Sequence, residues 1–142
     1  MRVTMTILTG LMMVLTAHSE IVTALRPAIR EAAAKNGVDP VLMEAIIRHE
    51  SANATSSAAR RKNNLAGIMG RRGQRSYTSK EECVKDLARI LGKYKAKGRI
   101  SVAQIARVYC ASHSKWIRGV TANMKDIRKG RWGSEHIDSP AE

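Results

Sequence analysis

Glu50 is the residue of this chain with the clearest capacity for chemistry, because it ends an apolar helix pattern that begins at Asp39-Pro40. Asp39 can cap this helix, and Pro40 suits its first turn, where a missing N–H costs nothing. Steps of four back from Glu50 reach Ile46 and Leu42, so the carboxyl group shares the face directed at the core. Apolar surroundings and the negative end of the helix dipole both favour the protonated carboxyl, as a general acid near neutral pH requires. The alternative is a solvated glutamate in a last helical turn.

A second group of candidate residues lies in the long segment that follows, residues 51–78. This segment is rich in Ser, Ala, Asn, Gly and Arg, and its weak periodicity predicts a loop. Asn63 and Asn64 suit a tight turn and can also present amide donors and acceptors to sugar hydroxyl and acetamido groups. Gly67 allows a close approach to the backbone. Alone, such residues are more typical of a structural turn, but their position after an acid-terminated helix favours a site.

The rest of the chain must position these residues, and its pattern is helical. Apolar residues recur at helical spacing in four further segments, namely residues 20–35, 79–97, 101–109 and 114–130. Pro27 predicts a kink or a new start in the first of these, and Asn36-Gly37 predicts its end. Ser79 and Ser101 are expected to cap two of the later helices. Because long alternating runs of β-branched residues are absent, we expect a mainly α fold of short helices around a long basic loop.

The net charge restricts the possible partners. The chain has 142 residues, enough for one domain with a real core, and 25 Lys and Arg against 12 Asp and Glu give a formal net charge of +13. Such a charge predicts an anionic partner, and nucleic acid, anionic lipid and cell-wall polymers all qualify. The lack of Phe and the few aromatic residues argue against base stacking, so no specific nucleic-acid partner is expected.

The two ends of the chain differ from its middle. Arg2, a short uncharged stretch and Ala17-His18-Ser19 predict a secretory signal peptide at residues 1–19, with an uncleaved membrane anchor or an ordinary first helix as alternatives. Residues 20–130 are expected to form one domain, and residues 131–142 a flexible tail. A signal or an anchor would place the domain in the periplasm, the cell wall or the extracellular space.

The sequence contains two cysteines, Cys83 and Cys110. In an exported chain they can form a disulfide, and the alternative is a pair of small core residues that remain unpaired. The four histidines are too scattered to suggest a zinc site, and we expect neither a metal nor a cofactor.

Four motifs in a fixed order resemble the glucosaminidase branch of the lysozyme-like superfamily, glycoside hydrolase family 73, which is related to the lytic transglycosylases. The similarity runs from about Gly37 to Ile127. The motifs are Gly37-Val38-Asp39-Pro40 with His49-Glu50-Ser51, then Asn63-Asn64-Leu65-Ala66-Gly67-Ile68, then Tyr77, Ser79 and Glu82, and finally Ile105-Ala106-Arg107-Val108-Tyr109 with Ser112-His113-Ser114-Lys115-Trp116.

The resemblance implies a lysozyme-like bundle in which the long basic loop or a small lobe flanks a glycan groove. It also implies an N-acetylglucosaminidase-type enzyme that cleaves the glycan strand of peptidoglycan. With the predicted signal peptide and the net charge, we expect an exported monomer that meets the anionic polymers of the wall. Glu50 would be the catalytic acid, with Tyr109 near the reaction centre and Ser51 supporting the end of the helix.

The resemblance also implies which residues would bind the substrate. Asn63, Asn64 and Gly67 would shape or line the substrate site. Trp116 and Tyr77 would either contact sugar rings or belong to the core. Departures from the family pattern include Ala66 at a position that an aromatic residue usually fills.

The missing second carboxylate is the most consequential departure, because residues 51–80 contain no Asp or Glu. Inverting hydrolysis needs a partner carboxylate about 6.5–9.5 Å away, and retaining hydrolysis needs one at about 5–5.5 Å. Glu81, Glu82 and Asp86 are the nearest candidates, but they look like residues that stabilise a helix start. A lone acid suffices if the 2-acetamido group of the substrate attacks the anomeric carbon.

Two alternative functions remain open from the sequence. Glu50 can act first as acid and then as base and form anhydro-muramic ends, as the lytic transglycosylases do. The chain can also be a non-catalytic basic module that binds cell-wall polymer or nucleic acid, for which its charge is the main support.

Overall fold

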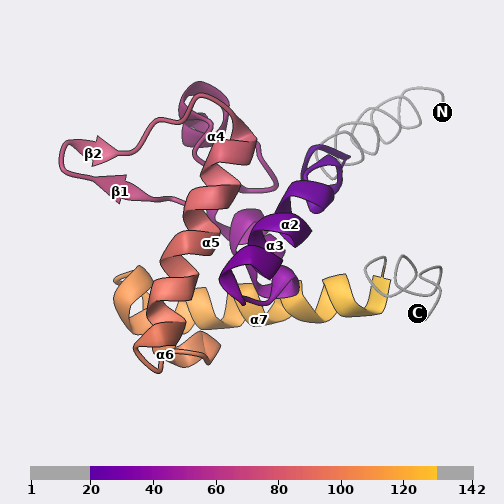
Figure 1. The fold of residues 1–142 in the computed structure, drawn as a ribbon, viewed down its shortest axis with the longest axis vertical. Helices are drawn as coiled ribbons and strands as arrows, with labels where there is room; N and C mark the ends of the chain where they lie inside the picture. Colours follow the sequence, from indigo (N-terminus) through magenta and orange to yellow (C-terminus); the bar gives the residue numbers. More distant parts are fainter. Residues whose placement is uncertain (1–19, 131–142) are drawn as a thin grey trace, which may run out of the picture.

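The computed structural model describes residues 20–130, which form a mainly helical protein as expected (Figure 1). Residues 20–24 are helical and are separated from the next helix by Leu25. The elements that follow are α2 (Arg26–Asn36), α3 (Pro40–Ser51), α4 (Ser57–Lys62), β1 (Met69–Gly70), β2 (Gly73–Gln74), α5 (Lys80–Ala96), α6 (Val102–Tyr109) and α7 (His113–Gly130). Among the described residues, none of these helices has the length and apolar character needed to cross a membrane. The predicted signal peptide and tail lie outside the described residues.

Most helix ends fall where the sequence predicts them. The Asp39 side chain accepts a hydrogen bond from the Val41 backbone N–H at 2.8 Å, and Ser79 caps α5. Ser101 forms a reciprocal capping box with Gln104 at the start of α6. The break that Pro27 predicts occurs at Leu25, because proline fits the first turn of α2 and not the helix interior.

The weak periodicity of residues 51–78 predicted a loop, whereas the resemblance also allowed a small lobe. The structure shows a small lobe, which we call the hairpin lobe. It contains α4, which Ser56 caps, and an antiparallel hairpin in which Met69 pairs with Gln74 and Gly70 with Gly73. Elements this short carry too few residues to show a period, which is why the sequence pattern did not reveal them.

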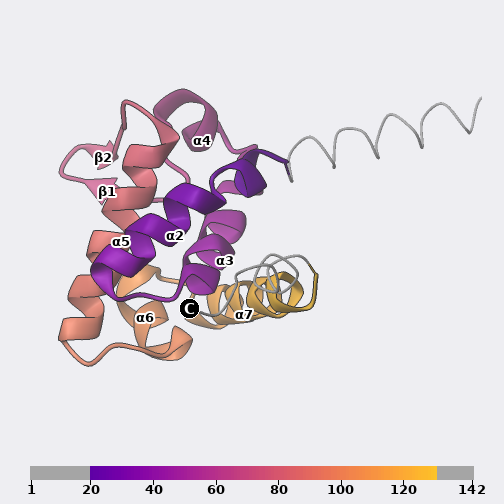
Figure 2. The same ribbon diagram turned by 45° about the vertical axis from the view of Figure 1, so that its right-hand side comes forward.

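Helix α3 is the central element of the fold. It packs between α2 and α7, as Figures 1 and 2 show, while α2 also packs on α5 and α6 on α7. Every residue from Val41 to Ile47 is buried. Helix α7 runs antiparallel to α3, since Asn123 donates to the Ala45 carbonyl at 3.1 Å and Arg128 reaches Asp39 at 3.5 Å. With neighbours on both sides, α3 fixes the direction in which its last residues point.

One charged side chain, Glu44, lies inside this apolar helix and has no exposed surface. Its carboxylate accepts from both Arg26 (Nε to Oε2, 3.0 Å) and Arg48 (Nη2 to Oε1, 2.7 Å). Because Arg26 belongs to α2 and Arg48 to α3, this charge network joins the two helices. Removing one member of a buried network leaves the remaining charges desolvated and unpaired, which is much more costly than losing an exposed pair.

Replacing Glu44 by Ala should therefore lower the free energy of unfolding by about 3–5 kcal/mol, as measured by urea denaturation. Glu31→Ala is the matched control, because it breaks the Glu31–Lys35 pair, whose side chains are 67% and 70% exposed. This control should lose little stability, because water and salt screen an exposed pair. Equal losses in the two variants would show that the Glu44 network does not hold α2 to α3.

Candidate active site

The carboxylate of Glu50, one residue before the end of α3, is held between two other parts of the chain. Its Oε1 atom accepts a hydrogen bond from the Trp116 indole N–H at 2.6 Å. Its Oε2 atom lies against Gly67. Any other residue at position 67 would place its Cβ atom only 3.1 Å from this oxygen. Glu50 is partly buried. The structure thus brings Glu50 together with two of the residues that the motifs single out.

The chain turns sharply after Glu50. The Ser51 hydroxyl is buried, donates to the Ile47 carbonyl and accepts from the Ala54 N–H, so the expected support of the helix end by Ser51 is confirmed. Three successive residues, Ala52, Asn53 and Ala54, adopt left-handed φ values of 47°, 57° and 69°. This conformation costs a residue with a side chain about 1–2 kcal/mol, so the turn is a strained one that the Ser51 bridge holds in place.

Aromatic rings cover one side of the Glu50 carboxylate. Trp116 is only 2% exposed and its ring lies 5.3 Å from that of Tyr109, while His49 meets it edge-on at 6.4 Å. A Cβ atom on Gly119 would come within 2.3 Å of the His49 ring, so only glycine lets α7 approach α3 this closely. Of the two roles that the motif left open for Trp116, its burial fits the core, where it also holds Glu50.

Tyr109 reaches across to the hairpin lobe. Its hydroxyl donates to the Ala66 backbone carbonyl. Burial, and after it the negative charge of Glu50, raise the pKa of Tyr109 well above its ordinary value, so the phenol stays protonated and acts as a donor. Tyr109 thereby fixes the loop segment that carries Gly67 beside Glu50.

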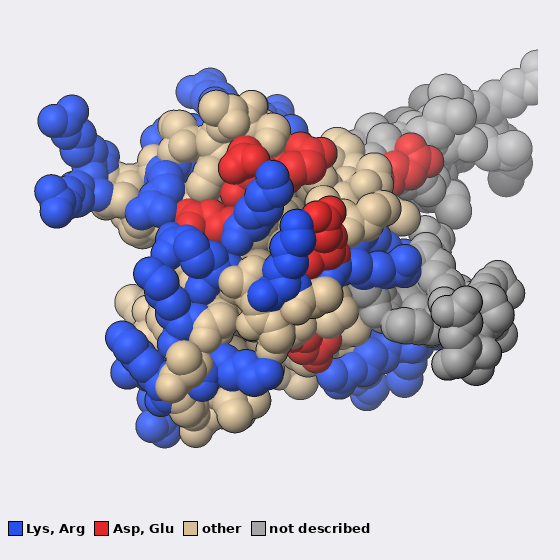
Figure 3. Space-filling view, in the orientation of Figure 1, with Lys and Arg blue, Asp and Glu red and all other residues tan. Residues whose placement is uncertain are grey.

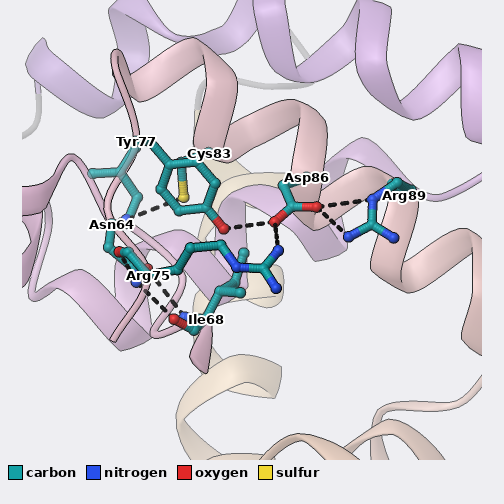
Figure 4. Close-up of polar contacts among 8 residues, drawn as sticks. Asn64, Ile68, Arg75, Tyr77, Cys83, Asp86 and Arg89 are labelled. Carbon is teal, nitrogen blue, oxygen red and sulfur yellow. Dashed lines mark hydrogen bonds and ion pairs between the residues drawn. The ribbon is translucent and has the colours of Figure 1, made fainter. Parts of the chain in front are cut away.

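The two asparagines hold the hairpin lobe together, and Figure 4 shows the contacts of Asn64. Asn64 is 1% exposed, and its side chain bonds the Ile68 N–H (3.0 Å), the Ile68 carbonyl (2.8 Å) and the Arg75 carbonyl (2.9 Å). Asn63 ends α4 in the left-handed conformation and donates to the Tyr77 carbonyl at 3.2 Å. Both side chains therefore shape the lobe, and the amide of Asn64 is fully engaged by the backbone.

Tyr77 joins the hairpin lobe to α5 through Asp86. The Tyr77 hydroxyl donates to Asp86 at 2.6 Å, and Arg75 and Arg89 approach the same carboxylate at 2.8 Å each (Figure 4). Burial raises the pKa of Asp86, but these hydrogen bonds outweigh burial and bring the net pKa below its ordinary value. A carboxylate neutralised by two guanidinium groups is a poor general base.

The other two candidates for a second carboxylate are exposed in the first turn of α5. Glu82 pairs with Lys85 at 2.9 Å, and its backbone N–H is capped by Ser79. Glu81 and Glu82 lie where acidic residues offset the positive end of a helix dipole.

A cavity of about 260 Å³ lies between the hairpin lobe, α5 and α6. It is lined by Gly67, Ile68, Met69, Ile90, Tyr94, Val108 and Tyr109. Gly67 thus borders both this cavity and the Glu50 carboxylate. Met69 and Val108 are 62% and 39% exposed, so the cavity presents some apolar surface to solvent, which can contact the apolar faces of sugar rings.

Sequence reasoning missed several of these lining residues. Ile90 and Tyr94 are spaced four apart on α5, so their pattern is that of a core stripe. Tyr94 was the one signal in the sequence, because an aromatic residue at the end of a core stripe can be partly exposed and contact a ligand.

Both cysteines are free thiols, so the unpaired alternative applies in this structure. The buried Cys83 sulfur accepts from the Leu65 N–H at 3.3 Å, which ties the asparagine loop to α5. Burial raises the pKa of each thiol. Among residues 20–130, no group of three or more His, Cys, Asp or Glu side chains is placed to hold a metal ion.

A comparison with known families matches residues 26–129, from the start of α2 almost to the end of α7. The matching family is described as Glucosaminidase: Mannosyl-glycoprotein endo-beta-N-acetylglucosaminidase. No curated protein and no solved structure matches the chain. The family match covers most of the chain and includes both α3 with Glu50 and the hairpin lobe. The chain therefore belongs to the glucosaminidase family, glycoside hydrolase family 73, and is a glycoside hydrolase that acts on peptidoglycan.

Proposed function

We propose that this protein is an exported N-acetylglucosaminidase that cuts the glycan strand of peptidoglycan with Glu50 as its single catalytic carboxylate. The observation that carries the proposal is the placement of Glu50, with Oε1 held by Trp116 and Oε2 against Gly67. The hydrogen bond from the indole occupies one oxygen and leaves the other to carry the proton. Gly67 and Tyr109 border the cavity in which a sugar ring can lie, and its lining is both polar and apolar.

The chemistry follows from having one acid. Glu50 donates its proton to the glycosidic oxygen as the bond from that oxygen to the anomeric carbon breaks. The carbonyl oxygen of the 2-acetamido group attacks the anomeric carbon and forms a cyclic oxazolinium ion. Glu50, now ionised, takes a proton from water as the water opens this ring, which restores the acid and leaves a reducing N-acetylglucosamine end. This route restricts the substrate to N-acetylated amino sugars.

The engagement of Asp86 supports the single-acid route. Asp86 is the carboxylate through which the hairpin lobe contacts α5. Tyr77, Arg75 and Arg89 already bind it, so it is poorly suited to activate water as a second catalytic group. Formation of anhydro-muramic ends uses the same acid without water and is the competing outcome of the test below.

Export is proposed from the pattern of residues 1–19 alone. If the segment is a cleaved signal peptide, N-terminal sequencing of the secreted protein should begin at Glu20. A secreted or membrane-bound chain that retains Met1 would contradict cleavage.

Replacing Glu50 by Gln should reduce the clearing of purified cell walls by about 10²–10⁴-fold, because the amide keeps the shape of the side chain but cannot donate a proton in this way. Glu82→Gln is the matched control. It removes a carboxylate that the sequence offered as a second catalytic group, and it should retain activity. If the Glu50→Gln variant cleared cell walls as fast as the unaltered protein, Glu50 would not be the catalytic acid.

Mass spectrometry of the released fragments then identifies the reaction. The proposal predicts reducing N-acetylglucosamine ends that incorporate one oxygen from labelled water. Anhydro-muramic ends without the label would instead assign the chain a lytic transglycosylase reaction.

Trp116→Phe should lower kcat about tenfold or more and leave KM nearly unchanged, because a hydrogen bond to a charged group is worth about 1.5–3 kcal/mol. Val120→Ala is the control for packing, since Val120 is a buried residue one turn further along α7. Steady-state kinetics on solubilised glycan strands separates the two constants. A rise in KM with kcat intact would mean that Trp116 binds sugar and does not position Glu50.

A further inference from the structure

The positive charge of this protein is concentrated in two segments on either side of the cavity. The hairpin lobe, residues 51–78, contains six Lys and Arg and no Asp or Glu. Residues 97–118, which include α6 and the start of α7, contain five Lys and Arg and again no Asp or Glu. By contrast, residues 20–50 contain four Lys and Arg against five Asp and Glu. We call the two cationic stretches the basic segments.

The basic segments face the same hollow. Ile68 and Met69 of the hairpin lobe line the cavity on one side, and Val108 and Tyr109 of α6 line it on the other. Arg71 and Arg72 form the exposed turn that follows β1, and the exposed Arg107 directly precedes Val108. In Figure 3, Lys and Arg side chains project from the tip of the hairpin and cover the same side of the molecule down to α6.

Three exposed cations of the basic segments have no acidic partner in the described part of the chain. Among residues 20–130, no ion pair involves Arg71, Arg72 or Arg107, whereas Arg75 is paired with Asp86. Their charges are therefore available to a ligand.

A bare glycan offers no charge to these arginines. In peptidoglycan, however, every second sugar carries a lactyl-linked peptide with free carboxylates, so a strand lying in the cavity presents anions on both sides. We propose that the basic segments bind the stem-peptide carboxylates of that strand, which makes the peptide-bearing glycan the preferred substrate. This inference rests on the proposed function.

The position of the cations distinguishes these carboxylates from the phosphates of other wall polymers. A separate polymer can bind anywhere on a basic surface, whereas groups covalently attached to the bound glycan must lie beside the cavity. Each exposed contact is individually weak and screened by salt, so the effect depends on several contacts acting together.

Binding is measured with the Glu50→Gln variant, so that the wall is not consumed. The probe is insoluble peptidoglycan stripped of phosphate polymers, either unmodified or with its carboxyl groups converted to neutral amides by a carbodiimide and a small amine. Amidation should weaken binding about tenfold at low ionic strength, and added salt should remove the difference between the two probes.

Adding Arg71→Gln, Arg72→Gln and Arg107→Gln to that variant removes three exposed, unpaired cations of the basic segments. These changes should weaken binding to the unmodified probe about three- to tenfold, because each exposed contact contributes little alone. Binding to the amidated probe should stay unchanged, since that probe has no carboxylates for the arginines to meet.

The matched control adds Lys125→Gln, Arg128→Gln and Lys129→Gln to the same parent variant. It also removes three exposed cations, all near the C-terminal end of α7, and none of them lines the cavity. The net charge therefore falls by the same amount as in the variant without Arg71, Arg72 and Arg107. The control should bind both probes as the parent does.

Three results would overturn the proposal. Amidation without effect would show that carboxylates are not the ligand. An equal loss in the α7 control would show that only the overall charge counts. Strong binding only to walls that retain their phosphate polymers would assign the basic segments to those polymers. None of these readouts requires turnover, so they remain separate from a failure of Glu50 as the catalyst.

Discussion

The buried carboxylate of Glu44 is the constraint on which the arrangement of the helices depends. A charge without exposed surface is tolerated only when it is neutralised, and here Arg26 of α2 and Arg48 of α3 do so together. Because every residue from Val41 to Ile47 is buried, apolar character alone does not single out one face of α3, whereas the ion pairs of Glu44 do. Glu50 follows six residues later, about 9 Å along the same helix axis, so its direction is set by that choice.

The site is assembled from three separate parts of the chain. Helix α3 supplies the acid, α7 supplies the donor that holds one of its oxygens, and the hairpin lobe supplies Gly67 beside the other. The lobe is in turn fixed to α5 by the Tyr77–Asp86 contact and to α6 by the hydroxyl of Tyr109. Tyr109 is therefore a structural link as well as a neighbour of the cavity, and its two functions cannot be altered independently.

The features that could be predicted from the sequence are those that depend on residues close together in the chain. Helix caps and breaks depend on residues within a turn of one another, which is why Asp39, Ser79 and Ser101 fall where expected. The interactions that escaped prediction join distant positions. The Glu44–Arg26 pair spans two helices, and the indole of Trp116 reaches Glu50 from a helix that begins more than sixty residues later. No periodicity encodes such pairings, because they arise only when the helices pack.

The closure of the hairpin by a side chain has a consequence for design. Asn64 bonds the backbones of Ile68 and Arg75, and the Arg75 N–H also donates to the Ile68 carbonyl at 2.9 Å, so the base of the hairpin is closed before the first paired strand residue is reached. The tip beyond Met69 therefore extends from a base whose closure does not depend on the tip, and a change of loop length there is expected to leave Gly67 beside the acid.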